Sequence, residues 1–267
     1  VASSVQLKGP GKYKGTLPVP APRRPYFGER ALTPELKVQW LDYYEDVFVL
    51  AFPTPESSDK IADSDEKALY YRAPYTSRPN VKPFLPAPSV FAETVDAVIK
   101  KDQVLDITEY LKSDGSIDWD APAGDWTIMR FGTRNNGAVT RPAPYPGLGF
   151  EANKFDTTDF NDHFDNYVGK LLKRIGPRKK GVQAGLTMLH MDSWEMGAQN
   201  WTADFRGQFQ RRRGYDPLPF LPTYVGAIVG SLELSERFLW DVRLTAQELV
   251  LENHAGHIKT LGRRHGL

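Results

Sequence analysis

LTMLHMDSWEMGAQNW, residues 186–201, joins a short apolar run to a cluster of polar and aromatic side chains. The apolar part, Leu186–Met191, has the length of a strand. Asp192 and Glu195 follow at once, and in α/β barrels the catalytic groups lie on loops where parallel strands end. We therefore expect Leu186–Met191 to form a parallel strand with Asp192–Glu195 at its carboxyl end.

The residues after this run have the composition of a sugar-binding site. Aromatic rings cover the apolar faces of a pyranose, and carboxylates and amides bind its hydroxyls. We predict two catalytic carboxylates, Glu195 and Asp192, and four nearby substrate-binding residues, Trp194, Gln199, Asn200 and Trp201. The structural alternative is that Asp192 caps a turn, Glu195 is a solvated loop residue and the tryptophans belong to the core.

Composition narrows the class of protein. The 267 residues include 34 basic and 33 acidic side chains, giving a formal charge of +1, so we expect neither nucleic acid nor an anionic membrane as partner. No apolar run approaches the roughly 20 residues that a membrane-spanning helix needs. The absence of cysteine excludes disulfides and thiolate metal sites.

Before the central stretch, the chain divides into two predicted segments. Residues 1–88 hold an irregular, proline-rich beginning over 1–35, an apolar strand over Asp46–Phe52 and a long loop. Residues 89–148 show short strands, among them Ile117–Asp120 and Trp126–Gly132, with a turn over Pro122–Asp125 between them. We predict that residues 89–148 form an inserted antiparallel β module.

Residues 149–267 carry helical periodicity on both sides of Leu186–Met191. Apolar residues from Phe160 to Ile175 form one stripe after cap candidates at Asp156–Thr158, and further helices are predicted over 202–213 and 234–263. This order of elements predicts an α/β fold containing part of a TIM-like (β/α)8 barrel, with too few strands to close it. Residues 149–267 would then be the barrel segment that carries the active-site loop.

Several motifs together resemble glycoside hydrolase family 106, the α-L-rhamnosidases. The specific ones are Asp192–Glu195 and the following Gly197–Thr202 with Arg211–Asp216. Val49–Pro53 looks like an early barrel strand of the family, and Leu105–Thr108 with Trp126–Gly132 looks like its inserted β module. Further matches are Phe238–Arg243 and Gly149–Lys154, where Asn153 replaces an aspartate and Phe150 a leucine of the family pattern.

The resemblance implies exo-hydrolysis of terminal α-L-rhamnose in an oligosaccharide or glycan, with inversion and a calcium ion. Inverting glycosidases hold two carboxyl groups roughly 6.5–9.5 Å apart. Asp192 and Glu195 are close in sequence, so we assign Glu195 as one catalytic carboxylate and expect its partner beyond Leu267. The full-length protein is expected to be secreted or periplasmic. The rivals are another TIM-barrel glycosidase and a non-catalytic carbohydrate-binding fragment.

Secondary candidates each have a structural alternative. Glu151 is a substrate-binding candidate, but a surface ion pair with Lys154 is the alternative. His190 is predicted to be a packed histidine, and His254 with His257 shares a helix face without a third zinc ligand. The charge run Arg211–Arg213 is interpreted as a solvated helix end.

Overall fold

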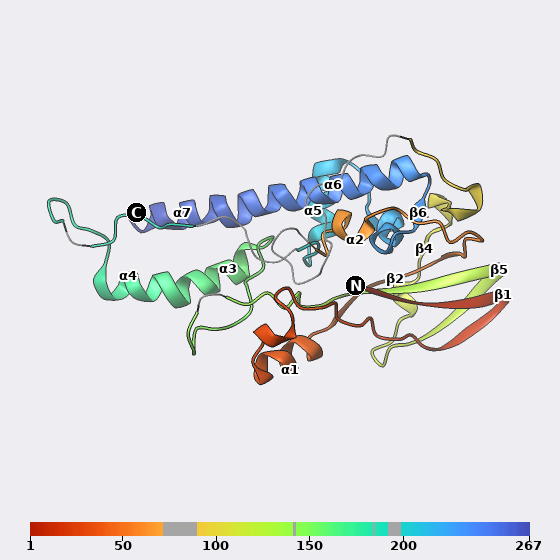
Figure 1. Ribbon diagram of the computed structural model, residues 1–267, viewed down its shortest axis with the longest axis horizontal. Helices are drawn as coiled ribbons and strands as arrows, with labels where there is room; N and C mark the ends of the chain where they lie inside the picture. The colour runs from red at the N-terminus through yellow and green to blue at the C-terminus, as the bar shows by residue number, and fades with distance from the viewer. Residues whose placement is uncertain (72–89, 141–142, 184, 192–198) are drawn as a thin grey trace.

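The computed structural model describes residues 1–71, 90–140, 143–183, 185–191 and 199–267. Figure 1 shows a sheet at one end and a long helical rod that runs to the other, with a second, shorter helical pair beside the rod. Mixed helix and antiparallel sheet confirms the α/β part of the prediction. Asp192, Trp194 and Glu195 lie outside the described residues.

The main sheet has four antiparallel strands in the order β1-β5-β2-β4. Its members are β1 (Ala2–Thr16), β2 (Glu45–Pro53), β4 (Leu105–Asp106) and β5 (Ser116–Thr133). Two-stranded parallel pairing joins β3 (Val98–Ile99) to β6 (Ile228–Val229). The sheet combines strands from the first two predicted segments, whose boundaries stay a prediction.

Strand β1 corrects the expectation of an irregular beginning, because Ala2–Thr16 pairs along its length with β5. Gly9, Pro10 and Gly11 lie together where the register shifts between Gly9 and Gly11. A Cβ on Gly9 would lie 1.8 Å from the carbonyl oxygen of Pro122, so only glycine allows this approach. The predicted turn at Pro122–Asp125 is likewise wrong, since β5 continues through it opposite the bulge.

Strand β2 confirms the apolar strand predicted over Asp46–Phe52, and its side chains belong to two hydrophobic cores. Leu50 and Phe52 face the larger core against the helices, whereas Val49 and Ala51 face a second core on the other side of the sheet. Its neighbours are antiparallel, so the resemblance-based assignment of Val49–Pro53 to an early barrel strand is not confirmed. No TIM barrel is shown by the residues that the structure describes.

The apolar run Leu186–Met191 is not the predicted parallel strand. Only Leu186 is bridged, to Pro177, and the remainder has no regular pairing. Leu186 and Leu189 pack against a small helical core, and Met188 and Met191 are exposed. A strand needs hydrogen-bonding neighbours, and the described part of the chain offers this run a single bridge.

The helices of the last segment follow the sequence closely. Asp156 caps α3 (Thr157–Phe164) by accepting from the backbone of Thr158, and Phe205 and Phe209 of α5 (Phe205–Arg213) are fully buried. Gly214 ends α5 in a left-handed conformation. The predicted third helix consists of α6 (Leu232–Val250), the π-helical η7 (Leu251–Gly256) and α7 (His257–Arg264).

The stripe of the first helix is divided by a second π-helical segment, η5 (Asp165–Gly169), which precedes α4 (Lys170–Ile175). Phe160, Phe164 and Leu172 are buried against Leu261 of α7, but Tyr167, Leu171 and Ile175 are exposed. The wider π turn changes which residues face the neighbouring helix. Three residues of the predicted apolar stripe, Tyr167, Leu171 and Ile175, therefore do not take part in the helix contact.

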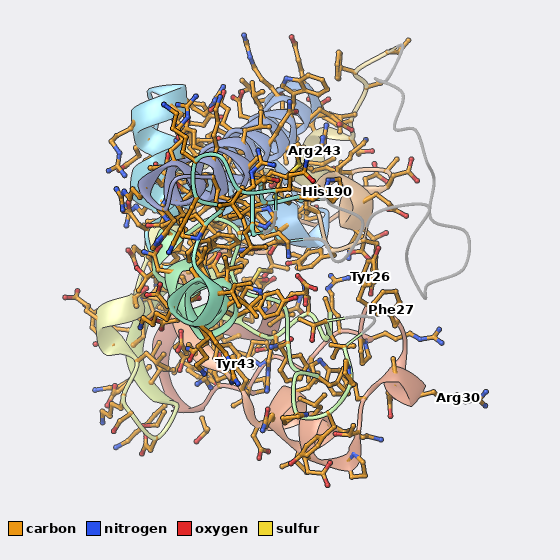
Figure 2. All side chains as sticks on the ribbon, turned by 90° about the vertical axis from the view of Figure 1, so that its left-hand side faces the viewer. Tyr26, Phe27, Arg30, Tyr43, His190 and Arg243 are labelled. Carbon is orange, nitrogen blue, oxygen red and sulfur yellow. The ribbon has the colours of Figure 1, made fainter. Side chains whose placement is uncertain are left out.

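The remaining elements are short and lie in the connections between the strands and longer helices. They are α1 (Pro34–Asp42), α2 (Ser64–Lys67), η1 (Glu29–Ala31), η2 (Val95–Ala97), η3 (Lys101–Gln103), η4 (Thr108–Tyr110) and η6 (Leu218–Val225). Figure 2 shows Arg30, the middle residue of the η1 turn, directed outward from the body of the protein. None of the helices in the described ranges is long and apolar enough to cross a membrane.

Candidate functional site

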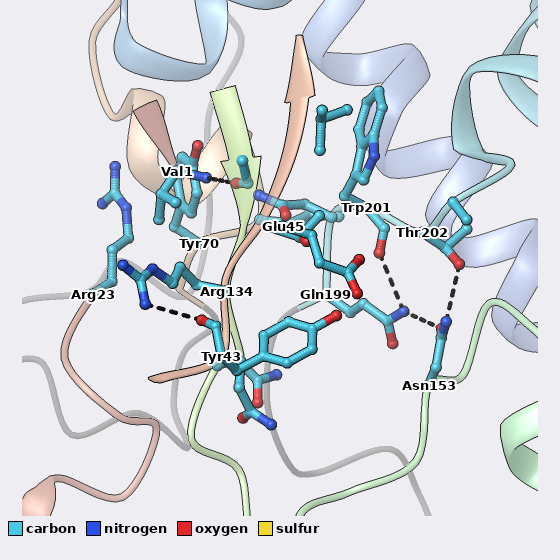
Figure 3. A pocket seen from close by; sticks show the side chains of 18 of the residues that line it. Val1, Arg23, Tyr43, Glu45, Tyr70, Arg134, Asn153, Gln199, Trp201 and Thr202 are labelled. Atoms are coloured by element: carbon cyan, nitrogen blue, oxygen red, sulfur yellow. Dashed lines mark hydrogen bonds between the residues drawn. The ribbon is translucent and has the colours of Figure 1, made fainter. Parts of the chain in front are cut away.

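A pocket of about 670 Å³ opens between the sheet end and the helical body. Its walls come from the beginning of β2, the end of β5, the segment 151–159 and the segment 199–203, together with Leu221 and Tyr224 of η6. Of the predicted site residues, Glu151, Gln199, Asn200 and Trp201 all line it. Residues more than 40 positions apart in sequence, such as Asn153 and Gln199, thus lie together in this pocket (Figure 3).

Gln199 is held by hydrogen bonds to the chain. Its Oε1 accepts from the backbone nitrogen of Lys154 at 3.0 Å, and its Nε2 donates to the side-chain oxygen of Asn153. Asn153 in turn donates from Nδ2 to the Thr202 hydroxyl at 2.9 Å and accepts from the backbone nitrogen of Phe155 at 2.9 Å. These bonds fix the predicted sugar-binding amide within the pocket wall (Figure 3).

Asn200 and Trp201 continue this wall. Asn200 donates to the carbonyl oxygen of Ala68 at 2.8 Å, and its own carbonyl accepts from the Tyr224 hydroxyl at 3.3 Å. Trp201 is half-buried and makes an edge contact with Phe48, with ring centroids 6.2 Å apart. The indole of Trp201 packs against the larger core and also borders the pocket. Its position is therefore compatible with both the structural and the sugar-binding interpretation.

Glu151 forms the ion pair that was its structural alternative. Its Oε2 lies 2.9 Å from Lys154 Nζ, and the Lys154 side chain is 10% exposed. A buried ammonium needs a partner, so Glu151 neutralises Lys154 at the pocket wall. This pairing leaves Glu151 in the pocket lining, and its role in substrate binding stays a prediction.

Three pocket residues near the start of β2 were not selected from the sequence. Tyr43 and Glu45 flank Tyr44 immediately before the apolar part of the strand, and Arg134 follows the end of β5. The signal that could have found Tyr43 and Glu45 is the alternation Tyr-Tyr-Glu-Asp, which places them on one face and Tyr44 with Asp46 on the other.

The pocket has an acidic part around Glu45 and a part lined by arginine side chains. Burial raises the pKa of Tyr43, and the negative charge of Glu45 adds to this shift. Arg134 donates from Nη1 to the carbonyl oxygens of Leu41 and Tyr43 at 2.7 and 2.9 Å. Arg23 pairs with Asp65 at 2.9 Å and lies 3.6 Å from the ring centroid of Tyr70. One wall is therefore rich in guanidinium groups.

The secondary candidates have other environments. His190 is exposed, so the prediction of a packed histidine is wrong. His257 contacts the side-chain oxygen of Asn161 at 2.6 Å, and His254 makes an edge contact with Phe160. Burial lowers the pKa of His254.

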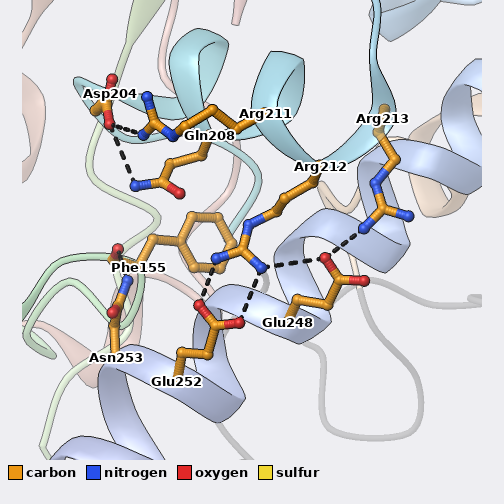
Figure 4. A network of polar contacts seen from close by, with 9 residues as sticks. All are labelled: Phe155, Asp204, Gln208, Arg211, Arg212, Arg213, Glu248, Glu252 and Asn253. Atoms are coloured by element: carbon orange, nitrogen blue, oxygen red, sulfur yellow. Dashed lines mark hydrogen bonds and ion pairs between the residues drawn. The ribbon is translucent and has the colours of Figure 1, made fainter.

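The arginine run is not a solvated helix end. Arg212 and Arg213 are mostly buried and pair with Glu248 and Glu252 on the long rod, as Figure 4 shows. Arg211 alone keeps an exposed side chain, which pairs with Asp204 at 2.7 Å.

The described residues were also tested as a calcium site. Within residues 1–71, 90–140, 143–183, 185–191 and 199–267, no group of three or more histidine or acidic side chains is placed to hold a metal ion. In the pocket, Glu151 is occupied by Lys154 and Asp156 by the start of α3. The described donor set thus does not fit calcium, and we derive no chemical step through it.

Comparison with known proteins places the chain in a family. A curated protein of Formosa agariphila named "Putative beta-glucuronidase" is 35% identical over 234 residues, which cover 88% of this chain and 19% of that protein. The structure of a rhamnosidase from Novosphingobium sp. PP1Y has a similar fold, with a TM-score of 0.73 and 24% identity, over 100% of this chain and 36% of that chain. This chain therefore spans about a fifth and about a third of their lengths. The family model described as alpha-L-rhamnosidase, Glyco_hydro_106, matches residues 1–267, and the chain accordingly belongs to glycoside hydrolase family 106.

Proposed function

We propose that the protein carrying this chain is a glycosidase that removes terminal α-L-rhamnose from a glycan. The observation that carries this proposal is the convergence of four predicted sugar-binding residues, Glu151, Gln199, Asn200 and Trp201, on one pocket. A ring beside carboxylates and amides matches a pyranose, which has apolar faces and polar edges. Family membership supports the rhamnose specificity.

The proposed reaction uses Glu195 as an acid–base carboxylate, with Asp192 as the second candidate. Hydrolysis with inversion needs one carboxyl group to protonate the leaving oxygen and another to activate water on the opposite face. The partner of Glu195 is proposed to lie in sequence beyond Leu267. Calcium and a secreted or periplasmic location also remain proposals that rest on the family.

The decisive experiment measures turnover of an aryl α-L-rhamnoside by the protein carrying residues 1–267. General acid–base catalysis contributes on the order of 10²–10⁴-fold, so Glu195→Gln should lower kcat by about that factor. Asp192→Asn is measured beside it, and KM for both variants separates a binding role from a chemical one. Unchanged kcat in Glu195→Gln would remove this residue from the mechanism.

A second candidate is hydrolysis of a β-D-glucuronide. The arginine-rich wall formed by Arg23, Arg24 and Arg134 favours it, because guanidinium groups bind carboxylates, and the curated relative is named for that activity. An aryl β-D-glucuronide assayed beside the rhamnoside distinguishes the two. Faster turnover of the glucuronide, with a loss on Arg24→Gln, would replace rhamnose as the proposed sugar.

A further inference from the structure

Glu45 is a pocket carboxylate that the family motifs did not select. It is the first residue of β2 and pairs in register with Thr133 of β5. Figure 3 shows its carboxylate directed into the space between Tyr43, Gln199 and Trp201. The side chain is exposed to that space, so its oxygens are accessible to a ligand.

The neighbouring residue Asp46, in contrast to Glu45, has a carboxylate that is used to stabilise the fold. It points to the opposite side and accepts two hydrogen bonds from Arg130, at 2.7 and 2.8 Å. Among the residues described by the structure, Glu45 forms no ion pair with a lysine or arginine. Its charge is therefore not used to neutralise a cation of the described fold.

The surroundings of Glu45 match the recognition of hydroxyl groups. The Tyr43 phenol lies beside it, and the fixed amide of Gln199 borders the same space. Trp201 adds a ring at the wall. An ionised carboxylate has two oxygens, which can accept hydrogen bonds from hydroxyl groups on adjacent carbons, an arrangement found on a sugar ring.

We propose that Glu45 is a substrate-positioning residue, whose carboxylate accepts hydrogen bonds from sugar hydroxyls while the sugar lies against Trp201. This inference rests on the proposed glycosidase function and deepens it, because it assigns a specificity determinant on the sheet rather than on the Asp192–Glu195 loop. A binding role predicts a loss of affinity with little change in the chemical step.

The first test compares Glu45→Gln with the wild type in the protein carrying residues 1–267. Hydrogen bonds to charged groups are strong enough that losing them raises KM for an aryl α-L-rhamnoside about ten- to a hundred-fold. We expect kcat to stay within about threefold of the wild-type value. Glu109→Gln is the matched control, since Glu109 is an exposed residue of η4 outside the pocket lining, and its KM should not change.

The second test identifies the hydroxyl. Aryl rhamnosides that lack one hydroxyl at a time are assayed with both proteins. Removing the hydroxyl that Glu45 binds should weaken the wild type strongly and Glu45→Gln by less than about threefold, because the interaction is already lost. Equal losses in the two proteins for every hydroxyl would overturn the proposal, and so would an unchanged KM or a loss confined to kcat.

A binding measurement separates this inference from the proposed function. If wild-type protein hydrolyses no aryl rhamnoside or glucuronide, the enzymatic proposal fails. Saturation-transfer NMR with free L-rhamnose and D-glucuronate then tests Glu45 directly. A signal from either sugar that is lost in Glu45→Gln and retained in Glu109→Gln supports the positioning role, whereas equal signals in all three proteins, or none in the wild type, contradict it.

Discussion

Arg130 donates two parallel hydrogen bonds to the carboxylate of Asp46, from Nε to Oδ1 at 2.7 Å and from Nη2 to Oδ2 at 2.8 Å. The same guanidinium donates from Nη1 to the carbonyl oxygen of Leu17 at 2.7 Å. It therefore joins β5 to β2 and to the residue after β1. This ion pair stands directly beside the pocket residue Glu45 without facing the pocket.

Removing the charge of Asp46 should destabilise the sheet. Asp46→Asn keeps the shape of the side chain but weakens both hydrogen bonds to the buried Arg130. We expect the free energy of unfolding to fall by about 1 kcal/mol, a small value for a charged hydrogen bond, because the Asp46 side chain is 36% exposed. Urea denaturation measures the change. Asp118→Asn, which breaks an exposed pair with Lys12, is the control and should leave stability within error.

The free energy of unfolding should fall in acid, because paired carboxylates become protonated. Hydrogen bonds from arginine lower the pKa values of Asp46, Glu248 and Glu252 below their ordinary values of 3.8 and 4.5. Their stabilisation is fully present well above these ordinary values, where the unfolded chain is also ionised, and it is lost as pH falls through the lowered folded-state values. Denaturation curves between pH 3 and pH 7 should show this drop, and Glu248→Gln should reduce it.

Gly132 should not tolerate a side chain. A Cβ built there would lie 2.3 Å from the ring of Tyr44, which packs near Arg130 and Arg134. Gly132→Ala must displace that ring, and we expect it to cost about 1–3 kcal/mol of folding free energy. Gly11→Ala is the control, because nothing lies within 4 Å of its added Cβ. Equal thermal midpoints for the two variants would show that Tyr44 moves aside freely.

Asn153 should position the pocket amide of Gln199. Asn153→Ala removes its bonds to Gln199, Thr202 and Phe155, and we expect kcat/KM to fall about ten- to a hundred-fold because the wall loses its geometry. Asn153→Asp preserves both acceptor contacts and can accept from the Thr202 hydroxyl, so it should retain most activity. Similar losses in both variants would mean that the donor of Asn153 is required.

Chelation tests the calcium proposal. If the full protein binds calcium in its site, EDTA should lower turnover of an aryl rhamnoside and added calcium should restore it. Binding of the metal to the folded state would also raise the thermal midpoint. Activity and thermal midpoint that do not respond to EDTA would contradict calcium as a cofactor.

The sequence predicted the elements whose evidence is local. The helix cap at Asp156, the stripe of α5 and the apolar core of β2 each depend on neighbours a few residues away, and the structure confirms them. Strand β1 was missed because its pairing partner begins more than 100 residues later. Leu186–Met191 was wrongly predicted as a strand because length and apolarity do not provide a hydrogen-bonding neighbour.

The residues of the candidate site also divide into those with local evidence in the sequence and those that depend on distant pairing. Gln199, Asn200 and Trp201 were selected because polar and aromatic residues cluster in sequence there, and all three line the pocket, while their role in binding stays a prediction. Glu45 and Arg134 were missed because they reach the pocket from strands that pair across the sheet. Only the register between β2 and β5 reveals that they share one space.

The pairing of β1 with β5 also has a consequence during synthesis. Ala2 pairs with Phe131, so β1 leaves the ribosome well before its partner exists. At roughly 5–20 residues per second, that interval is on the order of ten seconds. Lys8, Lys12 and Lys14 lie on the exposed face of β1. Lysine on an unpaired strand discourages pairing with other chains, so we expect these side chains to oppose aggregation of the nascent protein until β5 has been made.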